Sequence, residues 1–469
     1  MTDVLKKAFK ARGWFLFGVA VCIGINFMPT PDGLTLHGKY TLGLLLMVII
    51  FFLTEAIPFV ATSFLIVIYQ VFMGIRTYSE VPKTFMHDAV FFIMGALMVA
   101  AVIVKYDIHR RIAVFMMNKL GNNIHKIVFG IVTIAALCSA FMSEHAVSAM
   151  MLPIGVGLVV MNGGQNRCPQ LAKLLMFAIA YGSMIGAIAT PSGGTRNVIM
   201  ISYLQEFAGV HVGYGQWMLY VFPLTLILIP VVSFVLLKMF KPEVTELHTL
   251  DKDPQWKKSM KQPFSTKQKI VSGIFILTIL AWVFWGESMG LGQIAILSAV
   301  VYIILGLADW SDYEKINWQV ILFYAGIISL GECIRDTGVA IWIANQFSYF
   351  IEYAFAITTG APLIASTSML TMLLSNSMGA GPTIAVIGPI VLKIGELGGV
   401  SPTAIGISSA VATSFAYIIV AGAPASMIVY GSGFLKAKDF IKVGCVMSLA
   451  SILILTFVFI AGYWRLLGV

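Results

Sequence analysis

Two short polar stretches interrupt otherwise apolar sequence and carry the residue types best suited to binding an anion. The first reads Ser-Glu-His at positions 143–145, and the second reads Ser-Asn-Ser at positions 375–377. A helix that breaks at small hydroxyl or amide residues leaves backbone N–H groups free beside its positive dipole end. These N–H groups can donate hydrogen bonds to the oxygens of an anion. Two such stretches predict two anion cradles, an arrangement that would fit a ligand with two carboxylates.

Each polar stretch is accompanied by a second break rich in glycine and proline, at residues 189–197 and 420–426. Backbone can be interrupted at membrane depth only where protein or a water-filled cavity supplies the lost hydrogen bonds. The sequence therefore predicts a buried polar cavity where the breaks meet. The four apolar but interrupted segments span residues 124–161, 171–207, 362–397 and 402–433.

One permanent cation, Arg196, follows the glycines of the first break. We interpret Arg196, together with His145 when protonated, as the counter-charge to a dianion. The alternatives are that Arg196 snorkels towards an interface or pairs with Glu144, which would neutralise both charges. His145 could equally hydrogen-bond a carbonyl of the hairpin. Glu144 would repel an anion, so we expect it to hold His145 or Arg196 in place.

The interruptions recur at a nearly constant offset. Ser375 follows Ser143 by 232 positions, and Pro424 follows Pro191 by 233 positions. This offset indicates two structural repeats. Lysine and arginine near the N-terminus and in the stretch 238–269 place these segments in the cytoplasm, so the two hairpins open from opposite faces. Inverted repeats with paired broken helices are typical of secondary transporters.

Composition supports this interpretation for the whole chain. Of the 469 residues, 59% are hydrophobic and 11% are charged, whereas an average soluble domain carries about 25% charged residues. We expect an all-α polytopic membrane protein with about eleven transmembrane helices and two re-entrant helical hairpins. The predicted units are scaffold helices at 1–88, a first transport repeat at 89–237, a basic cytoplasmic linker at 238–269, further scaffold helices at 270–318 and a second transport repeat at 319–469.

Other function classes are disfavoured. The net charge of +9 is spread between apolar runs, as in membrane loops, so no nucleic-acid partner is expected. The five cysteines are scattered and form no CxxC pair, which favours neither a disulfide framework nor a zinc site. There is no HExxH motif and no P-loop. We expect no enzyme activity, no cofactor and no resident metal.

The paired tips, the two Pro-containing breaks and the TEAIP stretch at 54–58 resemble the divalent anion/sodium symporter family over nearly the whole chain. Members carry a Ser-Asn-Thr triplet at each hairpin tip, which binds substrate carboxylates and helps to form a sodium site. Positions 375–377 are close to that triplet, whereas positions 143–145 are not. The resemblance also implies a homodimer whose substrate-carrying part moves against a fixed scaffold. Gly193 and Ala421 would lie near the family's cation positions.

The departure at the first tip suggests the dicarboxylate-exchanger branch of the family. If Arg196 replaces a sodium ion, the empty site keeps its charge, and moving that charge through the membrane core is costly. We therefore expect sodium-independent exchange of C4–C5 dicarboxylates such as succinate, malate or 2-oxoglutarate. The alternatives are sodium-coupled symport, a citrate or tartrate exchanger and, from another class, an anion channel. The absence of an N-x-[ST] sequon favours a bacterial cytoplasmic membrane, with the N-terminus inside.

The candidate site residues come from both tips and both breaks. The expected substrate-binding residues are Ser143, His145, Gly194, Thr195, Arg196, Ser375, Asn376, Ser377, Ala423 and Pro424. Glu144 and Asn197 are expected to support them. A residual cation site would use Ser375, Asn376 and Ala421. Glu332 and Arg335 fall outside the predicted cavity and are interpreted as structural or interfacial.

Overall fold

The computed structural model describes every residue except 1, 109–110, 112–120, 248–262, 347–358 and 469, and within that range the chain is helical, without a β-strand. The middle of the linker predicted at 238–269 lies outside the described residues. The first half contains α1 (Thr2–Phe27), α2 (Leu36–Thr54), α3 (Phe59–Phe72), α4 (Val81–Phe85), α5 (Asp88–Lys105), α7 (Ile124–Ser139), α8 (Glu144–Met161), α9 (Gly164–Arg167), α10 (Pro169–Gly186), the 3-10 turn η1 (Pro191–Gly193), α11 (Thr195–Ala208) and α12 (Tyr214–Met239).

The second half repeats this order of long helices and short broken ones. It contains α14 (Thr266–Met289), α15 (Leu291–Ile304), α16 (Trp310–Glu314), α17 (Trp318–Asp336), α19 (Gly360–Met378), α20 (Ala380–Leu397), α21 (Pro402–Ala412), the 3-10 turns η3 (Thr413–Phe415) and η4 (Val420–Gly422), α22 (Pro424–Tyr430), α23 (Ala437–Ile454), the π-helical η5 (Leu455–Tyr463) and α24 (Trp464–Leu466).

Length and composition identify the membrane-crossing helices. Among the described residues, eight helices are long and apolar enough to cross a bilayer, and four shorter apolar helices accompany them. The eight are α2, α5, α8, α12, α14, α17, α20 and the continuous stretch Ala437–Leu466. The expected all-helical polytopic fold is therefore confirmed.

All four predicted interruptions are present. The helix ends at Ser139 and restarts at Glu144 in the first segment, and a single glycine separates α19 from α20 in the third. Gly379 has φ +81°, a conformation that other residues adopt only at a cost. Prolines restart the chain after the other two breaks: Pro191 begins η1 and Pro424 begins α22. Proline suits a first helical position because its missing N–H would have no partner there.

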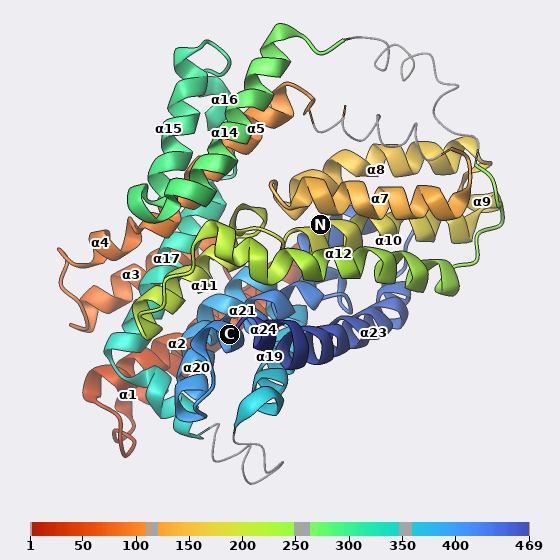
Figure 1. Ribbon diagram of the computed structural model, residues 1–469. Helices are drawn as coiled ribbons and strands as arrows, with labels where there is room; N and C mark the ends of the chain where they lie inside the picture. The colour runs from red at the N-terminus through yellow and green to blue at the C-terminus, as the bar shows by residue number, and fades with distance from the viewer. Residues whose placement is uncertain (1, 109–110, 112–120, 248–262, 347–358, 469) are drawn as a thin grey trace.

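The packing of two helices bears on the predicted domain boundaries. In Figure 1 the helices α7, α8, α10 and α12 form one layer, with α23 alongside, and α10 contacts α7, α8 and α12. Helix α5, however, packs most extensively against α15, and α17 packs against α3. Both α5 and α17 were expected in the transport repeats. We propose that they belong with the scaffold helices, so that each transport repeat begins after them.

A close contact between α7 and α10 gives a test of this layer. A β-carbon added at Gly186 would lie 2.1 Å from the carbonyl oxygen of Ala136, so the two helices would have to separate. We expect Gly186→Ala to destabilise the protein by about 1–3 kcal/mol, measured as a lower melting temperature in detergent. The matched control is Gly273→Ala in α14, where nothing lies within 4 Å. Equal melting temperatures for both variants would contradict the packing.

Candidate functional site

The first break is held to the tip of the first hairpin by hydrogen bonds to main-chain oxygens. The Thr190 hydroxyl donates to the carbonyl of Ala140, and it accepts from the N–H of Gly193 at 3.2 Å. The Asn197 amide donates to the carbonyls of Ala187 (2.9 Å) and Thr190 (2.8 Å). Asn197, predicted to support the site, therefore has a structural contact: from the first turn of α11, its amide binds main-chain carbonyls on the other side of the break.

The second break is held by the predicted triplet itself. The Ser375 hydroxyl donates to the carbonyl of Thr413 at 2.6 Å. The Asn376 side-chain oxygen accepts from the N–H groups of Ile418 (2.9 Å) and Ile419 (3.4 Å), and its NH2 donates to a carbonyl in α19. The structure thus places both side chains in contacts that join the hairpin to the break. Ser377, the third member, is exposed.

Arg196 and Glu144 meet where the first hairpin tip reaches the first break. The guanidinium nitrogens lie 3.3 and 3.4 Å from one Glu144 carboxylate oxygen, and both side chains are almost fully buried. Glu144 lies in the first turn of α8, after the N-cap Ser143, and Arg196 lies in the first turn of α11. This is the arrangement in which the two charges neutralise each other, one of the alternatives considered from the sequence.

The remaining candidate residues differ in their contacts. Ser143 caps α8 by accepting from the N–H of Ala146 at 3.4 Å. His145 is exposed and has no hydrogen-bond or ion-pair partner among the described residues, so it is not held by Glu144. Gly194 and Ala423 are the N-cap residues of α11 and α22, and Pro424 follows directly. Ala421, a candidate cation ligand, is exposed.

Tyrosines join the two repeats, and the sequence did not single them out. The Tyr324 hydroxyl of α17 accepts from the Thr195 hydroxyl of the first break. It also lies against Gly381 of α20, where a β-carbon would come within 2.2 Å of it. The Tyr181 hydroxyl donates to the carbonyl of Tyr417 in the second break at 3.2 Å. The two hydrogen-bonded pairs are separated by 129 and 236 positions, so no local sequence pattern could predict them.

Buried polar atoms without a hydrogen-bond partner among the described residues gather around the two breaks. A buried polar atom without a partner costs about 1–3 kcal/mol, so a cluster of them indicates a place where a ligand or water binds. The atoms in the segments that contain the breaks are Ser139 Oγ, Arg196 Nε, Asn197 Oδ1, Ser409 Oγ, Ser414 Oγ and Tyr417 Oη, and two others, Ser272 Oγ and Ser451 Oγ, lie elsewhere in the chain.

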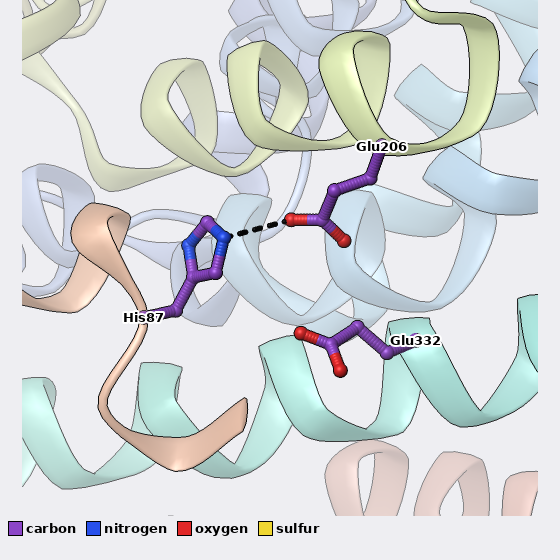
Figure 2. A group of neighbouring side chains, drawn as sticks. All are labelled: His87, Glu206 and Glu332. Carbon is purple, nitrogen blue, oxygen red and sulfur yellow. Dashed lines mark ion pairs between the residues drawn. The ribbon is translucent and has the colours of Figure 1, made fainter. Parts of the chain in front are cut away.

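A second group of charged residues links α11 to the helices beside it. Figure 2 shows His87, before α5, pointing at Glu206 of α11, with Glu332 of α17 alongside. The His87 Nε2 atom lies 3.0 Å from a Glu206 oxygen. Arg335 lies 3.4 Å from Glu206, and Arg76 lies 2.8 Å from Glu332. The interpretation of Glu332 and Arg335 as structural agrees with these ion pairs.

His87, Glu206 and Glu332 have their ligand atoms within 4.8 Å of one another, a spacing that a metal ion could use. The hydrogen bonds argue against it. His87 Nδ1 accepts from the N–H of Ala89 at 3.2 Å, which leaves the ring proton on Nε2, the atom facing Glu206. A metal on Nε2 would move that proton to Nδ1, against Ala89 N–H. Arginines already pair with both carboxylates.

Opposing influences act on the protonation of His87. Burial opposes the charged imidazole, but the hydrogen bond to Glu206 and the nearby carboxylates outweigh burial and raise the pKa of His87 above its ordinary value. The added proton would go to Nδ1 and would displace the N–H of Ala89. The cluster is therefore best described as an ion-pair network that fastens α11, the helix of Arg196, to α17 and to the start of α5.

The buried ion pair can be tested by a mutant cycle. Either Arg196→Gln or Glu144→Gln alone leaves an unpaired buried charge, which costs about 3–5 kcal/mol. We expect both single variants to melt well below the parent, and the double variant to recover most of the loss. Lys393→Gln serves as control, because Lys393 pairs with the exposed Glu396 and such pairs contribute about 0–1 kcal/mol. Additive losses in the double variant would contradict the pairing.

The charged network has its own test. We expect Glu206→Gln to lower the melting temperature, because it removes the carboxylate shared by His87 and Arg335. Glu287→Gln is the matched control, since Glu287 faces His211 at 3.8 Å with both side chains exposed. Millimolar Zn²⁺ should leave the melting temperature of the parent unchanged. Stabilisation by Zn²⁺ that is lost in Glu206→Gln would instead identify a metal site.

Comparisons with known proteins agree with this architecture. Two solved structures superimpose with a TM-score of 0.58 at 12% sequence identity, which compares the fold alone. One is Neisseria gonorrhoeae MtrF, described as illuminating a class of antimetabolite efflux pumps, with 84% of this chain and 83% of that chain covered. The other is the Alcanivorax borkumensis YdaH transporter, with 83% and 88% covered. The chain thus shares a fold with polytopic membrane transporters.

Sequence comparison identifies the family. The sodium-dependent dicarboxylate transporter SdcS of Staphylococcus aureus is 25% identical over 459 residues, with 91% of this chain and 86% of SdcS covered. The family described as the sodium:sulfate symporter transmembrane region matches residues 11–469. The family expected from the paired tips is confirmed, and its members are transporters rather than enzymes. This multi-pass membrane protein belongs to the sodium:sulfate symporter family.

Proposed function

We propose that this chain is a secondary transporter of C4–C5 dicarboxylates such as succinate, malate or 2-oxoglutarate, working by alternating access in a bacterial cytoplasmic membrane. The observation that carries the proposal is the set of buried, unpartnered polar atoms around the two breaks, which includes Arg196 Nε and Asn197 Oδ1 in the first turn of α11, where Arg196 meets the first turn of α8 at Glu144. Free N–H groups at these helix starts suit carboxylate oxygens. The relative SdcS is named as a dicarboxylate transporter, which supports the substrate class.

The Arg196–Glu144 pair changes the expected coupling. Exchange was inferred from a fixed positive charge that the empty carrier could not take across the membrane. With Glu144 at 3.3 Å, the empty site is close to neutral. A dianion that enters this site would then find no net positive charge to balance it. Co-transported cations would supply that positive charge. We therefore propose sodium-coupled symport as the function that the geometry supports best.

Carbonyl oxygens gathered beside the first break support a cation as co-substrate. The carbonyl oxygens of Ser139, Ala140 and Ala187 all lie close to Gly193, where an added β-carbon would come within 2.8–2.9 Å of each of them. Ser139 and Ala140 end helix α7, where the dipole is negative. Carbonyls at half-helix ends coordinate Na⁺ in other transporters. At the second break, Asn376 already uses its side-chain oxygen.

Sodium-independent exchange is the second candidate, and one observation favours it. The contacts of Arg196 with Glu144 are long, and Arg196 Nε has no hydrogen-bond partner among the described residues. A substrate carboxylate could therefore recruit the guanidinium from Glu144. The resemblance to the family also supports a homodimer, and the basic residues near the N-terminus support its placement in the cytoplasm. Both features are part of the proposal.

Transport into proteoliposomes separates the candidates. We expect an inward Na⁺ gradient to accelerate labelled-succinate uptake by on the order of tenfold or more, because sodium supplies the missing charge. Citrate and tartrate as competitors test the substrate class. Uptake that needs internal dicarboxylate and ignores Na⁺ would establish exchange instead.

Two controls bear on the site and on the class of protein. Arg196→Ala should abolish uptake, whereas Lys393→Gln, at an exposed pair, should leave it unchanged. A net dicarboxylate current that depends neither on Na⁺ nor on exchange for a second substrate molecule would identify a channel. No movement of any dicarboxylate under any gradient would refute the proposed function.

A further inference from the structure

A basic pocket lies away from the breaks, at one end of three helices. It has a volume of about 410 Å³ and is formed by the start of α10, the end of α12 with the residues after it, and the start of α23. Its charged lining residues are Lys173, Lys238, Lys241, Lys442 and Asp439. The distribution of lysine and arginine predicts that this end of the helices faces the cytoplasm.

The lysines of the pocket are only partly neutralised. Lys173 pairs with Asp439 at 2.7 Å, and that carboxylate also accepts from a backbone N–H of its own helix. Glu243 lies near but binds the first N–H groups of α10 at 2.7 and 3.1 Å. Lys238, Lys241 and Lys442 form no ion pair within the described residues. The four lysines therefore outnumber the two carboxylates, and the pocket attracts anions.

An aromatic cluster joins the three elements that form the pocket, and one of its rings, Phe240, lines the pocket. The ring of Phe177 in α10 stacks on Phe240 after α12, with 5.4 Å between centroids, and packs edge-on against Phe440 of α23 at 4.9 Å. Each of the three elements that supply lysines thus supplies one ring. The lysine backbones are held at fixed separations by this cluster, so the site is formed before any ligand binds.

Apolar side chains continue from the lysines along the lipid-facing side of two helices. Phe234 precedes Lys238 by four residues in α12 and is 65% exposed. In α23, Val446 and Leu449 follow Lys442 by four and seven residues and are 43% and 58% exposed. Residues at these spacings share one helix face. A small free anion would make no contact with these apolar side chains, whereas the acyl chains of a lipid would pack against them.

We propose that this pocket binds the headgroup of an anionic phospholipid, with the phosphate between Lys238, Lys241 and Lys442 and the acyl chains along the exposed faces of α12 and α23. Basic pockets between transmembrane helices on the cytoplasmic side are suited to such headgroups. The helices concerned also support the breaks. Helix α10 ends at the first break, and Gly444 of α23 lies against the backbone of Tyr417. Bound lipid therefore stabilises the region of the breaks from the cytoplasmic end.

The test uses the purified full-length chain in neutral detergent with three probes: phosphatidylglycerol, phosphatidylcholine and glycerol 3-phosphate. We expect phosphatidylglycerol to raise the melting temperature and to remain bound in native mass spectrometry, and the other two to do neither. The triple variant Lys238→Gln, Lys241→Gln, Lys442→Gln should bind phosphatidylglycerol on the order of 100-fold more weakly.

Matched variants keep the test decisive. Lys126→Gln, Lys315→Gln, Lys438→Gln removes the same charge from exposed lysines that do not line the pocket, and it should bind like the parent. Replacing the three pocket lysines by arginine should preserve binding, and it stands in if the glutamine variant does not fold. Equal binding by the two glutamine variants would overturn the site. Displacement of the lipid by glycerol 3-phosphate at similar concentration would overturn the lipid assignment in favour of a soluble anion.

Discussion

The structure depends on how interrupted backbone is satisfied in the interior of a membrane protein. Each unpaired N–H or C=O group in such surroundings costs several kcal/mol, so a break survives only where something replaces the lost helix bonds. Here the replacement is local to each repeat. Thr190 and Asn197 close the first break, and Asn376 closes the second by accepting from two consecutive N–H groups. Each hairpin is therefore fixed to the break of its own repeat.

The two repeats, built alike, differ in charge. At the second tip the side-chain amide of Asn376 lies between the hairpin and the break, and both its NH2 group and its oxygen form hydrogen bonds within the protein. At the first tip Glu144 takes the corresponding place and meets Arg196 across the break. A charged pair inside a low-dielectric region responds strongly to any additional charge. In the proposed transporter, the first repeat is thus the half of the site where we expect binding of an anion and binding of a cation to influence each other most.

The sequence predicted the breaks well and their contacts poorly, for a physical reason. Glycine and proline act on the backbone at their own positions, so Pro191, Gly379 and Pro424 could be interpreted without knowing their neighbours. Arg196, Tyr324 and Arg335, the charged or hydroxyl partners of Glu144, Thr195 and Glu206, lie 52 to 129 positions away from them, and only the fold brings them together. For the same reason the sequence could not predict that the Asn376 side chain holds the break or that His145 is exposed, and the expected roles of both residues in substrate binding stay predictions.

Helix α10 connects the two polar regions of the molecule. It begins at the lysine pocket and ends at the first break, and its 18 residues extend about 27 Å. Nearly all of its side chains beyond the first turn are buried, so it contacts α7, α8 and α12 along its length. A helix packed on all sides moves as a rigid body. Any displacement of the first break relative to the membrane must therefore also move the basic end of α10, where anionic headgroups lie.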